Sequence, residues 1–166
     1  MMIGLVGVFV LLSFQFRSYI EPLIVMAAIP FALIGVIGGH VMLGMDISLP
    51  GILGFISLTG IVVNDSILLV LFLKKRRAEG MDVIQSAAQA SRQRFRAIIL
   101  TSLTTIAGLS PLLFERSLQA QVLIPLAISI AFGLLASTAL VLLVVPAMYA
   151  IFSDFGWTTT AKQVEQ

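Results

Sequence analysis

Asp65 is the only charged residue in the 25-residue stretch from Leu49 to Leu73. It lies nine residues before Lys74, which is about 13 Å along a helix that rises 1.5 Å per residue. If this stretch crosses a membrane whose apolar core is about 30 Å thick, the carboxyl group lies near the middle. An ionised carboxylate there costs at least about 2.5–3.5 kcal/mol, so the group must be neutral, paired or in contact with water. We therefore predict that Asp65 binds and releases protons; a permanently protonated Asp65 that only bonds a neighbouring helix is the alternative.

Polar partners for this carboxyl group are present nearby. Asn64 precedes it, and the uncharged stretch 97–114 carries four small or polar residues on one helical face: Thr101, Thr104, Thr105 and Gly108. Because the two stretches are joined through residues 74–96, we expect antiparallel helices, and depth alone favours Thr104 or Thr105 beside Asp65. Threonines in such helices often bond only their own backbone, and that alternative stays open.

The composition indicates whether water or lipid surrounds these residues. Of the 166 residues, 59% are hydrophobic and 11% are charged, against about 45–50% and 25% in globular proteins. So much apolar surface indicates a lipid environment. The net charge of +2 is too small for a nucleic-acid-binding surface. With one histidine, no cysteine and no glycine-rich phosphate loop, the sequence predicts no enzyme chemistry, no metal site and no cofactor.

The charged residues divide the chain into five apolar segments that we interpret as membrane spans. These are residues 1–16, which is a partial span, and residues 22–45, 50–73, 97–114 and 121–152. Residues 74–96 are predicted to be a basic cytoplasmic loop, in which Asp82 begins a short helix lying along the membrane surface. Residues 153–166 are predicted to be a cytoplasmic tail. Pro125 is expected in the first turn of the last span, and His40 near the outer surface. The predicted fold is an all-α integral membrane protein with five transmembrane helices.

The distribution of basic residues predicts the orientation. With five spans, nine of the ten Lys and Arg residues fall on one side of the membrane, and Arg116 alone falls on the other. Cytoplasmic loops are enriched in Lys and Arg. The N-terminus is therefore expected outside and the C-terminus in the cytoplasm.

Small residues recur at helical spacing on three of the predicted spans. Helices in lipid associate closely where small side chains let their backbones approach. We therefore assign five glycines to helix packing: Gly35 and Gly39 in the second span, Gly54 and Gly60 in the third, and Gly133 in the fifth.

Four segments in order resemble the resistance–nodulation–division (RND) superfamily of proton-driven efflux pumps. They are residues 21–35, GIVVNDSILLV (60–70), RFRAIILTSLTTIAGLSPLL (94–113) and residues 117–149. The resemblance covers residues 10–152 and favours the hydrophobe/amphiphile efflux branch. It implies membrane helices eight to twelve, half of an RND-type bundle, in a multi-pass permease of the bacterial inner membrane. It also implies export of hydrophobic or amphiphilic compounds by a homotrimer that works with a periplasmic adaptor and an outer-membrane channel.

The resemblance further implies a proton relay. The family's relay lysine matches Asn64 and its relay threonine matches Thr101, while Asp65 occupies the next position. The family's acidic pair belongs to a helix in the first repeat, which we expect outside this chain. Among the threonines, the resemblance thus favours Thr101 over Thr104 and Thr105.

Other functions are compatible with the same residues. Related membrane cores occur in auxiliary protein-export factors and in lipid- or sterol-sensing domains. A non-transporting, truncated remnant is a third reading, because the chain lacks the remainder of the permease, with its first repeat and periplasmic domains. The substrate cannot be read from these residues.

Overall fold

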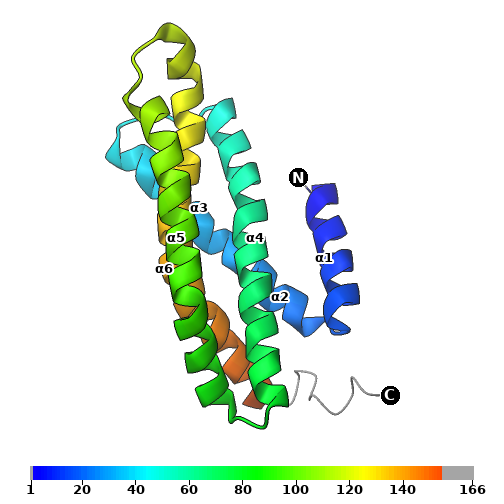
Figure 1. Cartoon of the computed structure of the whole chain (residues 1–166). Coiled ribbons are helices and arrows are strands. Elements are labelled where there is room, and N and C mark those ends of the chain that lie inside the picture. The colour runs from blue at the N-terminus through cyan, green and yellow to red at the C-terminus, as the bar shows by residue number, and fades with distance from the viewer. Residues whose placement is uncertain (1, 155–166) are drawn as a thin grey trace.

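A computed structural model describes residues 2–154 and contains helices joined by short turns (Figure 1). The helices are α1 (Met2–Phe16), α2 (Ile20–Met26), α3 (Ala28–Met42), α4 (Leu49–Ala78), α5 (Val83–Phe114) and α6 (Leu118–Asp154). Taken together, α2 and α3 make one apolar span, and α4, α5 and α6 are each long enough to cross a membrane. Residues 3–16 form a shorter apolar helix. The predicted all-α membrane bundle is confirmed.

The second span is interrupted at Ala27, between α2 and α3. Pro30 has no N–H and its ring clashes with the carbonyl of residue 26, which weakens the regular helix at this point. The Ala27 N–H still donates to the Leu23 carbonyl at 2.9 Å. Pro22 lies in the first turn of α2, where the absence of an N–H is tolerated.

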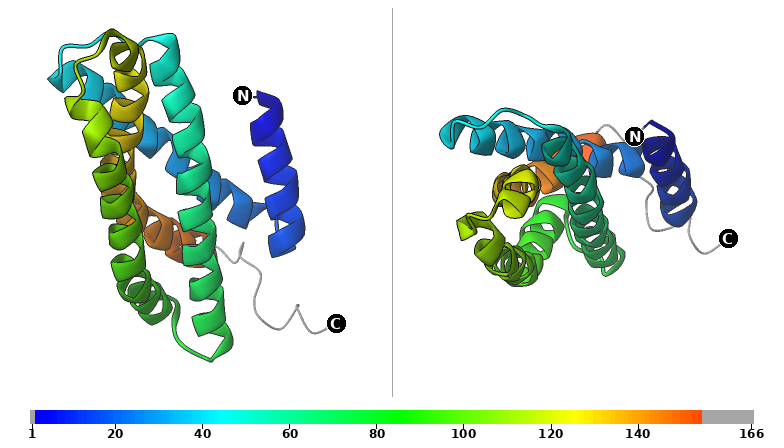
Figure 2. Two further views of the ribbon diagram at one scale, coloured as in Figure 1. Left: turned by 45° about the horizontal axis from the view of Figure 1, so that its top comes forward. Right: turned by 90° about the horizontal axis from the view of Figure 1, so that it is seen from above.

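Helix α6 lies at the centre of the bundle. It packs against α3, α4 and α5, and the view from above shows these three helices around it (Figure 2). The core between them contains fully buried side chains such as Leu58, Leu69 and Leu134. The backbone of α1 approaches only α2, and this helix stands apart from the others in both views of Figure 2.

Glycine turns end two of the helices. Gly44 and Gly80 have positive φ angles of 63° and 87°, which a residue without a Cβ adopts at little cost. After α4, the Gly80 N–H donates to the Arg77 carbonyl and the Met81 N–H to the Arg76 carbonyl. This pair of bonds is the Schellman arrangement that satisfies carbonyls at a helix end.

The segment 74–96 differs from its predicted form. Helix α4 continues to Ala78, and α5 begins at Val83 and runs without a break to Phe114. The short helix expected after Asp82 is thus the beginning of α5. Residues 83–107 contain no Gly or Pro, so nothing in this part of the sequence ends the helix before the apolar stretch.

The last span begins earlier than predicted. The Ser117 hydroxyl accepts a hydrogen bond from the Ala120 N–H at 3.3 Å, as expected for a residue that caps a helix start. Helix α6 therefore begins at Leu118, and Pro125 lies inside it rather than in its first turn. The predicted tail, residues 153–166, overlaps the end of α6 and otherwise lies outside the described residues.

Candidate functional site

Asp65 lies on the buried side of α4, where 9% of its surface is exposed. With Val62 it lines a cavity of about 10 Å³, which is closed by Ile98 of α5 and by residues of α6. A cavity of this size is at the lower limit for a single water molecule. Within residues 2–154, no hydrogen bond satisfies the carboxyl group. The site can therefore hold a proton on Asp65 and has room for about one water.

The hydroxyl groups nearest this cavity come from α5 and α6. Ser137 and Thr138 line the cavity itself. Ser102 of α5 is hydrogen-bonded to Thr138 through their hydroxyl oxygens, 2.7 Å apart. The sequence analysis had not considered Ser102 or Thr138. The sequence contains a signal that could have found Ser102. It follows Thr101 by one residue, so its side chain lies on a different face of α5.

Arg94 is the second charged group of this site. Among the described residues it forms no direct ion pair with Asp65, so any attraction between the two charges acts over a longer distance. Its guanidinium lies over the Phe72 ring, 5.4 Å from the centroid, and its Nε is buried without a hydrogen-bond partner among residues 2–154. The sequence analysis had counted Arg94 only as a cytoplasmic basic residue. Because α5 is continuous, Arg94 lies on the same helix as the threonines and half-buried against α4.

The residues predicted to surround Asp65 face elsewhere. Asn64, Thr101 and Thr104 are exposed, and Thr105 is half-buried. The three hydroxyls donate to carbonyls of their own helix, at distances of 2.8–2.9 Å. The structure therefore shows the backbone-bonded arrangement and does not gather these residues around Asp65.

The exposed small and polar residues form two rows, which we call the polar stripes. One stripe follows α4 and the other follows α5, and all their members are exposed: Ser57, Gly60, Asn64, Thr101, Thr104 and Gly108. Membrane helices place such residues against protein or water more readily than against lipid. Among the described residues, no helix packs on these two stripes.

Four of the five predicted packing glycines lie at close helix contacts. A Cβ added at Gly35 would lie 2.5 Å from the Phe132 carbonyl oxygen, and one at Gly54 would lie 2.6 Å from the Leu126 carbonyl oxygen. At Gly39 an added Cβ would collide with the Phe132 side chain. At Gly133 it would collide with the Leu58 and Val36 side chains. Real Cβ atoms do not approach backbone atoms so closely, so the packing at Gly35 and Gly54 requires glycine. Gly60 differs, because an added Cβ would meet nothing within 4 Å among the described residues.

His40 is buried between helices rather than exposed at the membrane surface. Only 1% of its surface is accessible, and Nδ1 lies 2.9 Å from the Val36 carbonyl oxygen. A Cβ at Gly51 of α4 would lie 3.0 Å from His40 Nε2. Ser129 of α6 donates to the Gly51 carbonyl at 2.7 Å. Gly51, which the sequence analysis did not select, thus lets α3, α4 and α6 meet.

A buried ion pair connects α2 to the far end of α4. Lys74 Nζ donates to Glu21 Oε2 at 2.9 Å and to the Phe16 carbonyl at 3.3 Å. The Glu21 side chain is fully buried, and Lys74 is 20% exposed. Lys74 therefore holds the α1–α2 turn against α4. It is also one of the basic residues from which the orientation was predicted.

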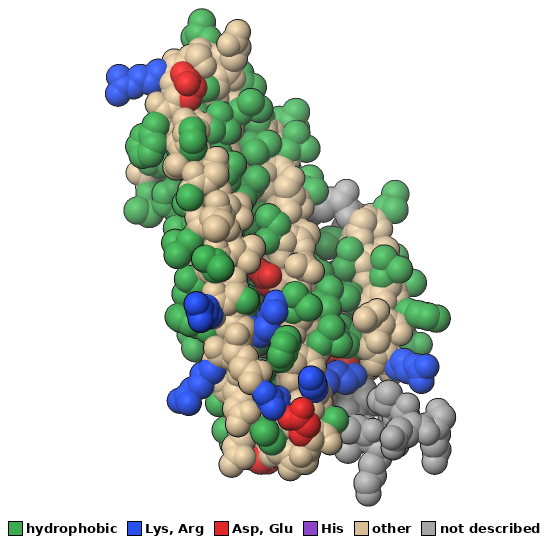
Figure 3. Space-filling model, in the orientation of Figure 1, with side chains coloured by type: hydrophobic (Ala, Val, Ile, Leu, Met, Phe, Trp, Pro, Cys, Tyr) green, Lys and Arg blue, Asp and Glu red, His purple; other side chains and the backbone are tan. Residues whose placement is uncertain are grey.

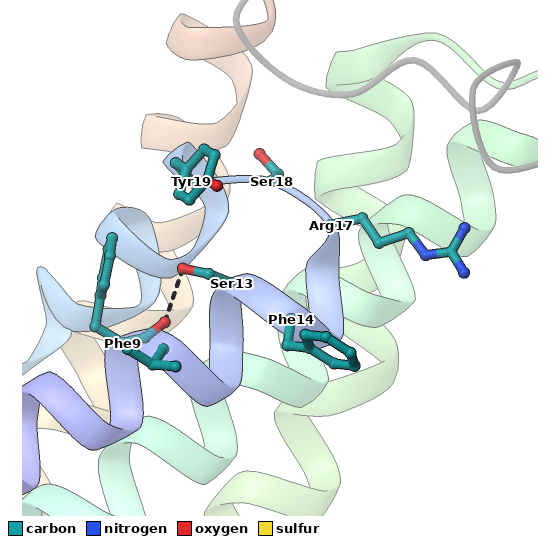
Figure 4. A pocket seen from close by; sticks show the side chains of 7 residues that line it. Phe9, Ser13, Phe14, Arg17, Ser18 and Tyr19 are labelled. Atoms are coloured by element: carbon teal, nitrogen blue, oxygen red, sulfur yellow. Dashed lines mark hydrogen bonds between the residues drawn. The ribbon is translucent and has the colours of Figure 1, made fainter.

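The hollow beside the α1–α2 turn offers less chemistry (Figure 4). It has a volume of about 400 Å³ and is lined by residues such as Phe9, Ser13 and Tyr19. The Ser13 hydroxyl donates to the Phe9 carbonyl at 2.8 Å, and the Arg17 side chain points away from both (Figure 4). The site around Asp65 and Arg94 is therefore the stronger candidate.

Comparison with known proteins agrees with the arrangement of these helices. The chain is similar to a heavy metal efflux pump whose X-ray crystal structure is known, with 27% sequence identity and a TM-score of 0.79. The match covers 92% of this chain and 15% of the pump, so the chain spans a small part of that protein. Residues 1–153 also match the model of the AcrB/AcrD/AcrF family. The chain therefore belongs to the AcrB/AcrD/AcrF family, within the RND superfamily that its motifs resemble.

Proposed function

We propose that this chain is the C-terminal membrane part of an efflux transporter driven by the proton-motive force, and that Asp65 carries the proton. The observation that supports this most directly is the position of Asp65, a residue only 9% exposed that makes no hydrogen bond among the described residues and lines a cavity about the size of one water. A group that only stabilised the bundle would be expected to have its hydrogen bonds satisfied.

The charge balance around Asp65 suggests how proton binding drives movement. When Asp65 is ionised, the positive charge of Arg94 attracts it, and α4 and α5 are held together at this depth. When Asp65 is protonated, that attraction is lost. Proton binding therefore changes the preferred separation of two helices, which is a two-state element that transport can use.

We propose that the remainder of the permease covers the polar stripes. Exposed Asn64 and Thr101 are costly against lipid, and a protein partner would supply hydrogen bonds. The partners implied by the family are the first repeat and the periplasmic domains, a homotrimer, a periplasmic adaptor and an outer-membrane channel. The expected location is the bacterial inner membrane.

The proposed orientation places the N-terminus outside and the α4–α5 turn in the cytoplasm. Figure 3 shows most Lys and Arg side chains gathered at the end of the molecule that carries this turn, whereas Arg116 lies between α5 and α6. Tags inserted after Met45 and after Ser117 should react with reagents in the periplasm. A tag between Gly80 and Asp82 should be protected from them. A protected tag at Met45 would contradict this orientation.

Hydrophobic or amphiphilic compounds are the proposed substrates. The similarity to a heavy metal efflux pump makes metal ions the second candidate. Proteoliposomes with an imposed pH gradient can separate them, if a fluorescent amphiphilic dye and a heavy metal ion are offered in parallel. The protein should be the full-length product of the reading frame that encodes this chain.

The same assay tests the proton carrier. Asp65→Asn keeps the size of the side chain and removes the titratable proton, so transport should fall by at least about a hundredfold. Expression and the detergent melting temperature should stay near those of the parent. Transport by Asp65→Asn at the parental rate, with an unchanged pH profile, would show that Asp65 is structural. The efflux assignment would then stand without this mechanism.

A further inference from the structure

The cavity beside Asp65 lies next to a contact between two hydroxyl groups, one from α5 and one from α6. The hydroxyl oxygens of Ser102 and Thr138 are 2.7 Å apart, and Thr138 lines the cavity together with Asp65. Ser102 is 3% exposed, and Thr138 is half-buried. We call these two residues the Ser102–Thr138 pair. The pair joins α5 to α6 at the point where the carboxyl group of α4 meets them.

The direction of the hydrogen bond in this pair follows from counting protons. A hydroxyl group has one proton to donate, and its oxygen can accept two hydrogen bonds. The Ser102 hydroxyl donates to the Ile98 carbonyl at 2.8 Å, so its proton is used within its own helix. Thr138 is therefore the donor between the two hydroxyls, and Ser102 is the acceptor. Toward the cavity, the Thr138 oxygen can then only accept.

Ser137 provides the second hydroxyl group of the cavity. This hydroxyl donates to the Leu134 carbonyl at 3.1 Å, so its proton is used in the same way. Both cavity hydroxyls thus accept hydrogen bonds from the cavity and donate none to it. A protonated Asp65 matches this lining, because its carboxyl group carries one O–H donor, whereas a carboxylate can only accept.

The pair can also take the opposite direction. If Ser102 releases the Ile98 carbonyl and donates to Thr138, the Thr138 proton can point into the cavity. Ile98 lies inside α5, where its carbonyl still accepts a backbone N–H from the next turn. The reversal therefore leaves no carbonyl unsatisfied. An ionised Asp65 would receive a hydrogen bond from Thr138, either directly or through the single water for which the cavity has room.

The charged and titratable groups of the surrounding helices do not take the place of Thr138. Arg94 of α5 forms no ion pair with Asp65 among the described residues. Residues 118–153, which make up nearly all of α6, carry no charge. In α3 the titratable residue is His40, which packs against the first turn of α4. The next charged residue of α4 is Lys74, nine positions after Asp65.

We propose that the Ser102–Thr138 pair hydrogen-bonds Asp65 in both of its protonation states, and that the pair reverses its direction when the proton leaves. The protonated carboxyl group donates to Thr138, and the carboxylate accepts from it. This inference rests on the proposed function, because it concerns the proton carrier, and it adds two residues to that site. The proton state of a group on α4 thereby changes the hydrogen bond that joins α5 to α6.

Infrared difference spectra of the full-length protein in lipid nanodiscs, taken between acidic and alkaline buffer, test the pair. The C=O stretch of protonated Asp65 is the band that disappears in Asp65→Asn. Thr138→Val removes the hydroxyl and keeps the shape, so this band should move to higher frequency as the carboxyl group loses its acceptor. Proton-driven transport by the same variant should fall about tenfold. Thr138→Ser keeps the hydroxyl and should restore both the band and the rate.

Two further variants separate the pair from its surroundings. Ser102→Ala should shift the band less than Thr138→Val, because Thr138 keeps its hydroxyl and loses only the partner that directs it. Thr59→Val is the matched control. Thr59 is half-buried on α4, and its hydroxyl donates to the Phe55 carbonyl of its own helix at 2.9 Å. Its band and its transport rate should equal those of the parent.

The outcomes distinguish this inference from the proposed function. An unmoved band in Thr138→Val, together with an inactive Asp65→Asn, would overturn the role of the pair and leave Asp65 as the proton carrier. A shifted band, together with parental transport by Asp65→Asn, would support the pair and overturn the proposed carrier. Equal changes in Thr138→Ser and Thr138→Val would show that Thr138 acts by packing, and would overturn the inference.

Discussion

Small residues in membrane helices meet different surroundings on two sides of this molecule. On one side, Gly35 of α3, Gly54 of α4 and Gly133 of α6 are buried at helix contacts. On the other, the polar stripes of α4 and α5 are exposed. In the most apolar part of α5, 11% of the residues are buried, against 50% in the corresponding part of α6. The same sequence pattern therefore marks contacts within this chain and a surface left open for something else.

The largest expected effect tests the buried side of this comparison. Gly133→Leu would force a side chain into Leu58 and Val36, and should destabilise the bundle by about 3 kcal/mol, the upper end of typical overpacking costs. Gly60→Leu is the matched control, and should change stability by less than about 0.5 kcal/mol, because its surroundings are open. Thermal melting of the purified protein in detergent measures both. Equal melting temperatures for Gly133→Leu and the parent would show that the close contact is absent.

The difference between Gly133 and Gly60 also shows how far the sequence could be interpreted. Composition and charge spacing predicted the helical spans, since a membrane requires long apolar helices. Small-residue spacing predicted helix packing at Gly35, Gly39, Gly54 and Gly133, and in the structure atoms of other helices lie close to each of these glycines. It could not say which neighbour a helix has, because the periodicity of one helix contains no information about another.

The candidate site shows the same limit. Asp65 was predicted, because a carboxyl group in an apolar stretch is conspicuous. Its neighbours, Asn64 and Thr101, were predicted from helical spacing and from the resemblance to the RND superfamily. Successive residues on a helix point about 100° apart, and α6 occupies the side toward which Asp65 points. Thr138 and Arg94 therefore line or influence the site, whereas Asn64 faces outward.

The second prediction concerns the proposed electrostatic attraction between Asp65 and Arg94. Arg94→Gln should lower proton-driven transport about tenfold, which corresponds to about 1.4 kcal/mol of coupling. Arg94→Lys should restore part of the activity, because it keeps the charge but not the planar contact with Phe72. The double variant Asp65→Asn/Arg94→Gln should be no worse than Asp65→Asn alone. Additive losses in the double variant would show that Arg94 acts independently of Asp65.

The smallest expected effects belong to the polar stripes. Thr101→Ala should lower transport by less than about twofold, because its hydroxyl already donates to the Ala97 carbonyl at 2.9 Å. Asn64→Ala should lower it about threefold, since a partner on this face would lose one hydrogen bond. Initial transport rates, corrected for the amount of folded protein, measure both. If Thr101→Ala were as severe as Asp65→Asn, the proton path would run along the exposed side of α5. The buried cavity between α4 and α6 would then be only a packing defect.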